Sequence, residues 1–344
     1  MSDIKLSRLY YMDLLRGLLM LLGVVLHTLA IFSIDYAWKI SSPEKVPYAG
    51  YIIDVIHSFR MPAFFIIAGF FTSLILVRKS RSSYVRLRLR RLGIPLLFVG
   101  IIINIPMSFL LTDSPATVGW IDYLGRGLWL GHLWFLSVLV LYSMLAAYFW
   151  PFISDVLKRN NILINLSIML LALLSYPILI RIGWRLDLYD VHLFVFATEN
   201  IFKYLPYFIV GIMYYYTSKD GVLIDKYKTL VFITIIFVFL WKYFPDGVVG
   251  DIFEFVSSLM ISFSIFSMMS IIMEGRDFPW VKKLADSSYT IFITHQPIII
   301  ILGLYLVDIS INVNLKVLLI LVITTTICLL IHKYCKRLTK HLLQ

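Results

Sequence analysis

The chain has 344 residues, of which 60% are hydrophobic and 15% are charged, and its mean hydropathy is +0.88. Soluble proteins are usually about 45–50% apolar and about 25% charged, so this composition excludes a soluble enzyme and a disordered or fibrous chain. The net charge of +11 does not indicate a nucleic-acid partner, because the basic residues lie between apolar runs, where they orient membrane helices. The sequence therefore predicts an all-α, polytopic membrane protein.

About ten segments are long enough to span a bilayer, since a helix needs roughly 20 apolar residues to cross the hydrocarbon core. The seventh segment is the shortest. We expect a single membrane domain over residues 1–344, with no cleaved signal peptide and no appended soluble domain. The expected spans are 10–32, 51–77, 92–111, 133–153, 162–180, 196–216, 230–244, 252–273, 287–307 and 313–332.

Lysine and arginine gather on one side of these spans. They lie mainly in the two tails and in every second loop. The loop after the second span is the most basic. Because such residues favour the cytoplasmic side, both termini are predicted to be cytoplasmic. The basic residues of that loop are Arg78, Lys79, Arg81, Arg86, Arg88, Arg90 and Arg91.

The first span carries ionisable residues where lipid would surround an ordinary helix. A charge at mid-membrane costs about 2.5–3.5 kcal/mol on insertion scales, so such residues usually face the protein interior. Arg16 and His27 are eleven residues apart, which is close to three helical turns, so they share one face at two depths about 16 Å apart. Asp13 lies one turn from Arg16 and is expected to pair with it. The alternative is structural, with a neutralised pair and a His27 that bonds a backbone carbonyl.

The second span adds a further group of ionisable residues. Asp54, His57 and Arg60 follow one another at three-residue steps, just before Pro62. We expect them at roughly the depth of His27, where two polar helices would form a cavity. For Arg60, snorkelling to the outer interface is the alternative explanation.

Other polar residues are candidates for substrate binding. Four of them are expected at the same outer level, whereas His295 is expected deeper, in the ninth span. Each also has a structural explanation. The tryptophan could belong to an interfacial belt, the two charged residues of the sixth span could form an ion pair, and the last histidine could accompany a proline kink. The candidates are His132, Trp134, Glu199, Lys203 and His295.

The basic stretch 78–91 exceeds what orientation requires. Contact with anionic lipid headgroups is one explanation. A phosphate site is the other, because guanidinium groups grip phosphate bidentately. A metal site is not expected, since no His/Glu pair has a zinc-binding spacing and the two cysteines lie far from the histidines.

These residues resemble the acyltransferase-3 family of integral membrane acyltransferases. The similarity extends in order over nearly the whole chain and is greatest to the branch that succinylates osmoregulated periplasmic glucans. That branch often has two adjacent histidines in the ninth span, where this chain has His295 followed by Gln296. The matching segments are Asp13-Leu-Leu-Arg16 with His27, His57-Ser-Phe-Arg60-Met-Pro62 with Gly69, Arg91-Leu-Gly-Ile-Pro95, His132-Leu-Trp134, Tyr204-Leu-Pro206 with Gly211, and His295-Gln-Pro297.

The resemblance implies an enzyme of the bacterial inner membrane with a cytoplasmic acyl-CoA donor, succinyl-CoA or acetyl-CoA, and a glycan hydroxyl as acceptor outside. On this hypothesis Arg16, with Arg88 and Arg91, holds the phosphates or the thioester of the donor. His27 is the general base. Arg60 stabilises negative charge, while His57 orients or relays. A covalent acyl-histidine intermediate is left open.

Two other functions compete with this interpretation. The first is an O-acetyltransferase that modifies lipopolysaccharide or another surface polysaccharide. The second is a transporter or flippase, which would use the same intramembrane charges as a substrate path. Neither an inverted repeat nor a pair of half-spans is visible in the sequence, which favours an enzyme.

Overall fold

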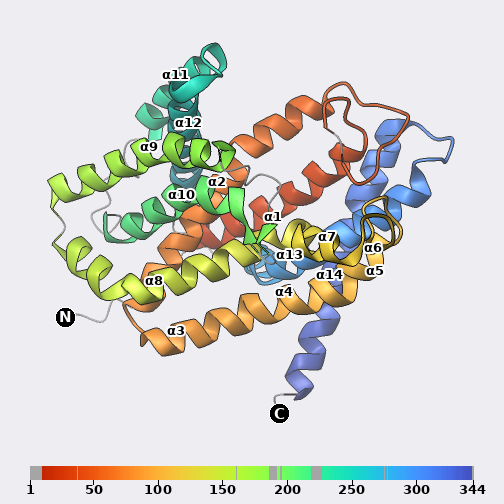
Figure 1. The fold of residues 1–344 in the computed structure, drawn as a ribbon, viewed down its shortest axis with the longest axis horizontal. Coiled ribbons are helices and arrows are strands. Elements are labelled where there is room, and N and C mark those ends of the chain that lie inside the picture. Colours follow the sequence, from red (N-terminus) through yellow and green to blue (C-terminus); the bar gives the residue numbers. More distant parts are fainter. Residues whose placement is uncertain are drawn as a thin grey trace. The chain divides into compact units, whose positions relative to one another are not determined.

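The computed structural model describes residues 10–36, 38–159, 161–185, 192–193, 196–217, 227–274, 276 and 278–342. Within these ranges the chain forms helices and one short antiparallel strand pair (Figure 1). The elements are α1 (Tyr10–Ile31), α2 (Ala49–Leu76), α3 (Arg81–Arg88), η1 (Leu89–Gly93), α4 (Ile94–Val99), η2 (Gly100–Asn104), α5 (Ile105–Ser108), α6 (Pro115–Val118), α7 (Trp120–Gly125), η3 (Leu128–Leu133), α8 (Trp134–Lys158), α9 (Ile162–Arg185), β1 (His192–Leu193), β2 (Phe196–Ala197), α10 (Thr198–Thr217), α11 (Tyr227–Tyr243), α12 (Gly247–Met273), α13 (Pro279–Leu306) and α14 (Val313–Leu342).

Among the described residues, eight helices are long and apolar enough to cross a membrane. This confirms the prediction of an all-α, multi-pass membrane protein. The sixth and seventh expected spans correspond to α10 and to the shorter α11. The sixth was expected to begin at residue 196, but Phe196–Ala197 pair with the preceding strand and the helix begins at Thr198. The number of ten spans and the cytoplasmic termini stay predictions.

Contacts along the chain group into two compact units. The first unit comprises Met1–Arg60 and Ile265–Gln344, and the second comprises Met61–Ser264. Helices α2 and α12 each contribute residues to both units. The units are therefore described one at a time.

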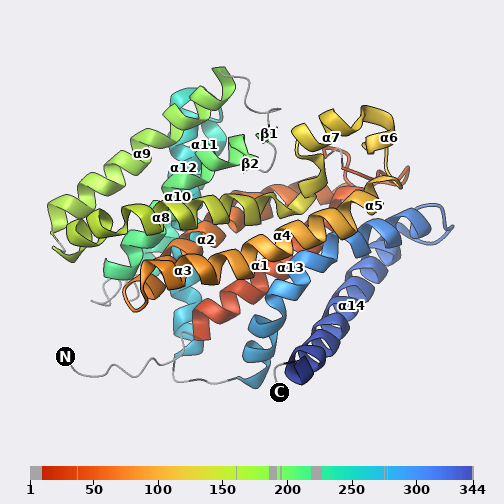
Figure 2. The same cartoon turned by 60° about the horizontal axis from the view of Figure 1, so that its bottom comes forward.

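In the first unit, α1 packs along α13, and α14 lies against both helices (Figure 2). Apolar side chains fill these contacts, with Leu14 of α1 against Met273 and Val281. Lipid tails are as apolar as these side chains, so close van der Waals fit rather than exclusion of water holds membrane helices together. This packing turns one face of α1 toward α13. His27 of α1 lies next to His295 of α13.

In the second unit, α2 and α10 meet backbone to backbone at two glycines. A methyl group added to Gly69 would lie 2.2 Å from the carbonyl oxygen of Phe208, and one added to Gly211 would lie 2.1 Å from that of Ile66. Both distances are far shorter than any van der Waals contact. Small residues at such crossings let membrane helices approach closely, and here only glycine fits.

The basic stretch after the second span is helical, which corrects the expectation of a loop followed by a span from residue 92. Residues 81–108 form a continuous rod, capped at its start by the Ser80 hydroxyl, which accepts from the Ser83 amide. Its two π-helical turns, η1 and η2, precede Pro95 and Pro106. Ile94 and Ile105 there bond the carbonyls five residues back. A proline cannot donate and clashes with the carbonyl four residues before it, and the wider turns accommodate this conflict.

We expect Gly211→Ala to destabilise the protein, because the added methyl group must push α10 away from α2. Overpacking of this kind costs about 1–3 kcal/mol, so the midpoint of thermal unfolding in detergent should fall. Gly125→Ala is the matched control, since no atom lies within 4 Å of its added methyl group. Equal midpoints for the two variants would contradict the close crossing.

Candidate functional site

The ionisable residues of the first span lie on one helix, α1, as predicted. Arg16 Nη1 is 3.5 Å from the Asp13 carboxylate, one turn away, and the Arg16 side chain is 37% exposed. The expected ion pair therefore forms while a large part of the guanidinium stays accessible. Because α1 is a regular helix from Tyr10 to Ile31, Arg16 and His27 share one face, about 16 Å apart along the axis.

Arg60 lies on that same face, between the levels of Arg16 and His27. It is buried, and its Nε donates to the carbonyl oxygen of Leu19 at 3.2 Å. Its guanidinium lies against Gly23, where an added methyl group would be 2.7 Å from Nη2. The sequence predicted Arg60 at the depth of His27. The structure instead places it one to two turns nearer to Arg16.

The ring of His27 contacts two other aromatic rings. The Trp38 ring stacks on it at a centroid distance of 5.4 Å, and the His295 ring lies 5.3 Å away at a 36° tilt. Trp38 comes from the connection between α1 and α2, whereas His295 comes from α13. The structure thus brings together two predicted site histidines that are more than 260 residues apart, and it adds a tryptophan that sequence reasoning missed.

The backbone of α13 determines which nitrogen of His295 is basic. Its Nδ1 lies 2.9 Å from the Ile291 carbonyl oxygen and 2.7 Å from that of Phe292. Two carbonyl oxygens at hydrogen-bonding distance require a proton on this nitrogen. In the neutral ring Nε2 then carries the lone pair. These contacts fit the alternative explanation of a histidine satisfied by its own helix, and they orient the His295 ring beside His27.

The α1–α2 connection (residues 32–36 and 38–48), which supplies Trp38, is tied down at several points. The amides of Ser42 and Val46 donate to the carbonyl oxygens of Ile31 and Phe32 at 2.9 and 2.8 Å. Ile40 and Val46 are buried. These bonds return the connection to the end of α1, so Trp38 is carried by an ordered segment.

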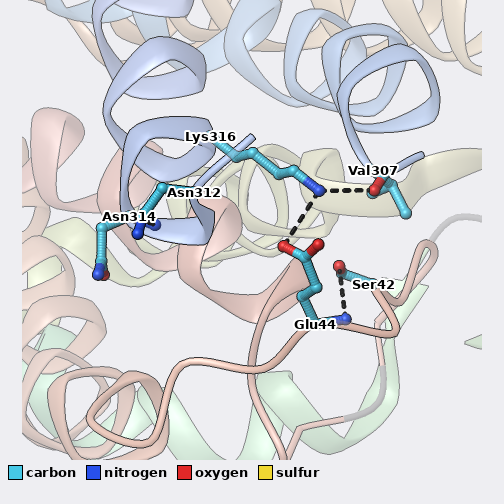
Figure 3. A network of polar contacts seen from close by, with 6 residues as sticks. All are labelled: Ser42, Glu44, Val307, Asn312, Asn314 and Lys316. Carbon is cyan, nitrogen blue, oxygen red and sulfur yellow. Dashed lines mark hydrogen bonds and ion pairs between the residues drawn. The ribbon is translucent and has the colours of Figure 1, made fainter. Parts of the chain in front are cut away.

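A buried lysine anchors the same connection from the other side. Lys316 of α14, with a side chain only 1% exposed, donates to the Val307 carbonyl oxygen at 2.9 Å and pairs with Glu44 at 3.1 Å. Figure 3 shows the Lys316 ammonium between the two oxygens, with the Glu44 amide donating to Ser42. A buried cation is tolerated when it is paired and hydrogen-bonded, and both conditions hold here.

Asp54 and His57 differ from Arg60 in burial, so the three residues do not form one buried group. Both are exposed, whereas Arg60 is buried. The Tyr36 hydroxyl donates to Asp54, and the His57 ring stacks on the Tyr36 ring at 6.1 Å. Burial and the neighbouring Asp54 raise the pKa of Tyr36 to about 12, so the phenol stays a donor at neutral pH. Three-residue steps drift by about 60° each around a helix, which separates residue 54 from residue 60.

In the second unit, two substrate-binding candidates flank the start of α8. His132 is buried in η3, directly after Gly131, whose φ of 49° is in the left-handed region that glycine adopts readily. Trp134 opens α8, and its ring stacks on Tyr204 of α10 at 5.7 Å. Tyr204 also stacks on Phe65 of α2 at 4.7 Å. Trp134 is thus part of an aromatic cluster that joins three helices.

Lys203, next to Tyr204, pairs with Glu254 of α12 at 3.2 Å. One turn earlier on α12, Asp251 pairs with Arg181 of α9 at 3.0 Å. The side chain of Glu199 lies outside the described residues. The sequence analysis did not single out either carboxylate of α12. Ionisable residues in membrane spans usually pair or take part in function, and applying this rule would have identified both.

The Arg88 side chain contacts α2 and its own helix, α3. Its Nη2 lies 3.3 Å from the Thr72 hydroxyl, and its guanidinium lies 5.2 Å from the centre of the Tyr84 ring. Arg91 is exposed. Their expected contact with donor phosphates stays a prediction. No group of three or more metal-ligating side chains is close enough to hold a metal ion among the residues that the structure describes.

Comparison with known proteins identifies the family. The family model described as an acyltransferase domain matches residues 9–333. The chain belongs to this acyltransferase family. It is 29% identical over 228 residues to proteins named glucans biosynthesis protein C, from Escherichia coli (strain K12), Escherichia coli (strain SMS-3-5 / SECEC) and Shigella dysenteriae serotype 1 (strain Sd197). The match covers 61% of this chain and 59% of each relative. No solved structure matches.

Removing Glu44, the partly exposed partner of the buried Lys316, should destabilise the anchor of the α1–α2 connection. Glu44→Leu leaves the ammonium buried beside Val307, and we expect it to lower the free energy of unfolding by about 1–3 kcal/mol. The double variant Glu44→Leu/Lys316→Met should recover most of this loss, because no charge then stays buried.

Thermal unfolding in detergent measures both effects. Asp155→Leu is the control, since it breaks an exposed pair with Arg159 that is worth less than about 1 kcal/mol. A double variant no more stable than Glu44→Leu would show that the pair does not act as a unit.

Proposed function

We propose that this protein is an inner-membrane acyltransferase that moves an acyl group, succinyl in the first instance, from cytoplasmic acyl-CoA to a hydroxyl of a periplasmic glucan. Both termini are then cytoplasmic, with the Arg16 end of α1 inside and the His27 end outside. Family membership supports acyl transfer. The glucan and the succinyl group are proposed from the names of the relatives and from the sequence resemblance.

One observation carries the proposal. A single helix face presents Arg16 at one level, the guanidinium of Arg60 at Gly23, and His27 beside His295 at the other level. Acyl-CoA is polyanionic and does not cross lipid, so its acyl group must meet the acceptor within the membrane. A face that is cationic below and imidazole-rich above suits a transfer between the two sides.

In the proposed reaction His27 acts as general base. Its imidazole takes the proton of the acceptor hydroxyl as that oxygen attacks the thioester carbonyl carbon. The tetrahedral adduct collapses when the carbon–sulfur bond breaks. The leaving thiolate then receives the proton from the imidazolium, so the product ester and free thiol form with no net change in the enzyme.

The neighbours of His27 have distinct proposed roles. Arg60 places positive charge along the α1 face, where it stabilises the developing oxyanion or the free carboxylate of a succinyl group. His295, with its proton held by the α13 backbone, presents Nε2 as an acceptor and orients the imidazole of His27. Trp38 offers an aromatic face of the kind on which sugar rings stack. Arg16, kept in place by Asp13, faces the donor end.

We expect His27→Ala to lower acyl transfer by about 10²–10⁴-fold, the usual contribution of a general base, without unfolding the protein. The assay mixes purified protein in detergent with labelled succinyl-CoA and acceptor glucan. His332→Ala is the matched control, because His332 also lies in a membrane helix and its ring bonds Thr290. Full activity of His27→Ala would remove His27 from the base role. Folded wild-type protein without transferase activity would favour a transporter.

The acceptor and acyl group are tested separately. Mass spectrometry of periplasmic glycans from wild-type and deletion cells should show a succinyl mark on glucans that disappears with the gene. Complementation with His27→Ala should not restore it. Loss of an acetyl mark from another surface polysaccharide, with glucans unchanged, would instead identify an O-acetyltransferase.

A further inference from the structure

Helices α3 and α8 lie side by side in the second unit (Figures 1 and 2). A groove of about 670 Å³ lies where α3 and η1 meet α8. None of its lining residues belongs to the α1 face described above. The proposed acyl transfer assigns no role to the residues around it. These residues are Arg81, Ser82, Val85, Arg86, Leu89, Arg90, Ile94, Met144, Ala147 and Tyr148.

The lining has two chemical parts. Three arginines, Arg81, Arg86 and Arg90, supply positive charge, and all three are exposed. Apolar side chains, including Val85, Leu89 and Ile94, form the rest. None of the described residues that line the groove is acidic. A ligand that satisfies both parts must join an anionic group to a hydrocarbon chain.

Helix geometry explains why Arg86 and Arg90 face the groove and Arg88 does not. Arg86 and Arg90 are four residues apart and therefore point the same way, whereas Arg88 is rotated by about 200° from each. Arg88 accordingly contacts Thr72 and Tyr84. In the basic stretch, Arg88 therefore points toward α2, whereas Arg86 and Arg90 point toward the groove.

The surface around the groove is apolar and exposed. Leu97 and Phe98 continue the rod beyond Ile94, and Phe149 and Phe152 flank Tyr148 on α8; all four are at least half exposed. In a chain that spans a membrane, such a surface faces lipid. The groove therefore opens where phospholipid is the abundant amphiphile, with its arginines at the end that the charge distribution places near the cytoplasmic headgroups.

We propose that this groove is a binding site for an anionic phospholipid. The phosphate is held by Arg86 and Arg90, with Arg81 at the rim, because guanidinium forks grip phosphate oxygens bidentately. One acyl chain lies along Val85, Leu89 and Ile94 toward the membrane interior. A free phosphate would use the arginines and leave the apolar part unoccupied.

The test is lipid retention by the full chain in native mass spectrometry. Protein in detergent is given a mixture of dioleoyl phosphatidylglycerol and dioleoyl phosphatidylethanolamine. The wild type should retain phosphatidylglycerol preferentially. Arg86→Gln/Arg90→Gln should reduce that retention by about tenfold or more, since each arginine near a headgroup contributes on the order of 1 kcal/mol.

Arg78→Gln/Lys79→Gln is the matched control. It removes the same charge from the preceding turn, where both residues are exposed and neither lines the groove. It should retain phosphatidylglycerol within about twofold of wild type. Equal losses in both double variants would overturn the proposal, because net charge alone would then explain binding. Thermal unfolding of each variant shows that the fold is unchanged, and Arg86→Lys/Arg90→Lys should keep part of the retention.

A second experiment distinguishes the binding of lipid from the binding of a soluble phosphate compound. Coenzyme A and inorganic phosphate are titrated against wild type and Arg86→Gln/Arg90→Gln by thermal shift. Unchanged responses in the variant support the lipid site. If the variant loses its response to coenzyme A while lipid retention is unchanged, the groove binds a soluble phosphate and the proposal is wrong.

Discussion

The cost of placing charge in a bilayer is the constraint on which the first unit depends. Three cations in its helices have oxygen partners: Arg16 has Asp13, Arg60 has the Leu19 carbonyl, and Lys316 has Glu44 and the Val307 carbonyl. Partnering limits the cost, and it also fixes where each charge lies. Gly23 fits the same arrangement, since a methyl group there would lie 2.7 Å from Arg60 Nη2 and the guanidinium would have to shift.

This arrangement connects packing with chemistry. Because α1 packs along α13, the imidazole of His27 meets that of His295. The α1–α2 connection, held by Lys316 and by backbone bonds, brings the Trp38 ring into a stack with the His27 ring. The stability of the Lys316–Glu44 anchor and the geometry of the candidate base are therefore linked, although Lys316 and His27 belong to different helices.

The helical rod 81–108 passes two prolines without a break and presents arginines on two sides. Pro95 and Pro106 each lack the backbone N–H that an α-helix uses, and the rod stays continuous through the π turns that precede them. Because the helix continues through the basic stretch, arginines two residues apart, such as Arg86 and Arg88, point to opposite sides. Arg88 stabilises contact with α2, and the row at Arg86 and Arg90 faces the groove beside α8.

The sequence by itself determined the membrane class, the family, the position of nearly every long helix, and the shared face of Arg16 and His27, because these follow from composition, motifs and the 3.6-residue repeat. Only the tertiary structure decided the depth of Arg60, the exposure of Asp54 and His57, the pairing of Lys203 with Glu254, and the place of Trp38 and His295 around His27. Those features depend on contacts between residues far apart in the chain. Helix periodicity sets the direction of a side chain from its own axis, but the neighbour that it meets is set by how the helices pack.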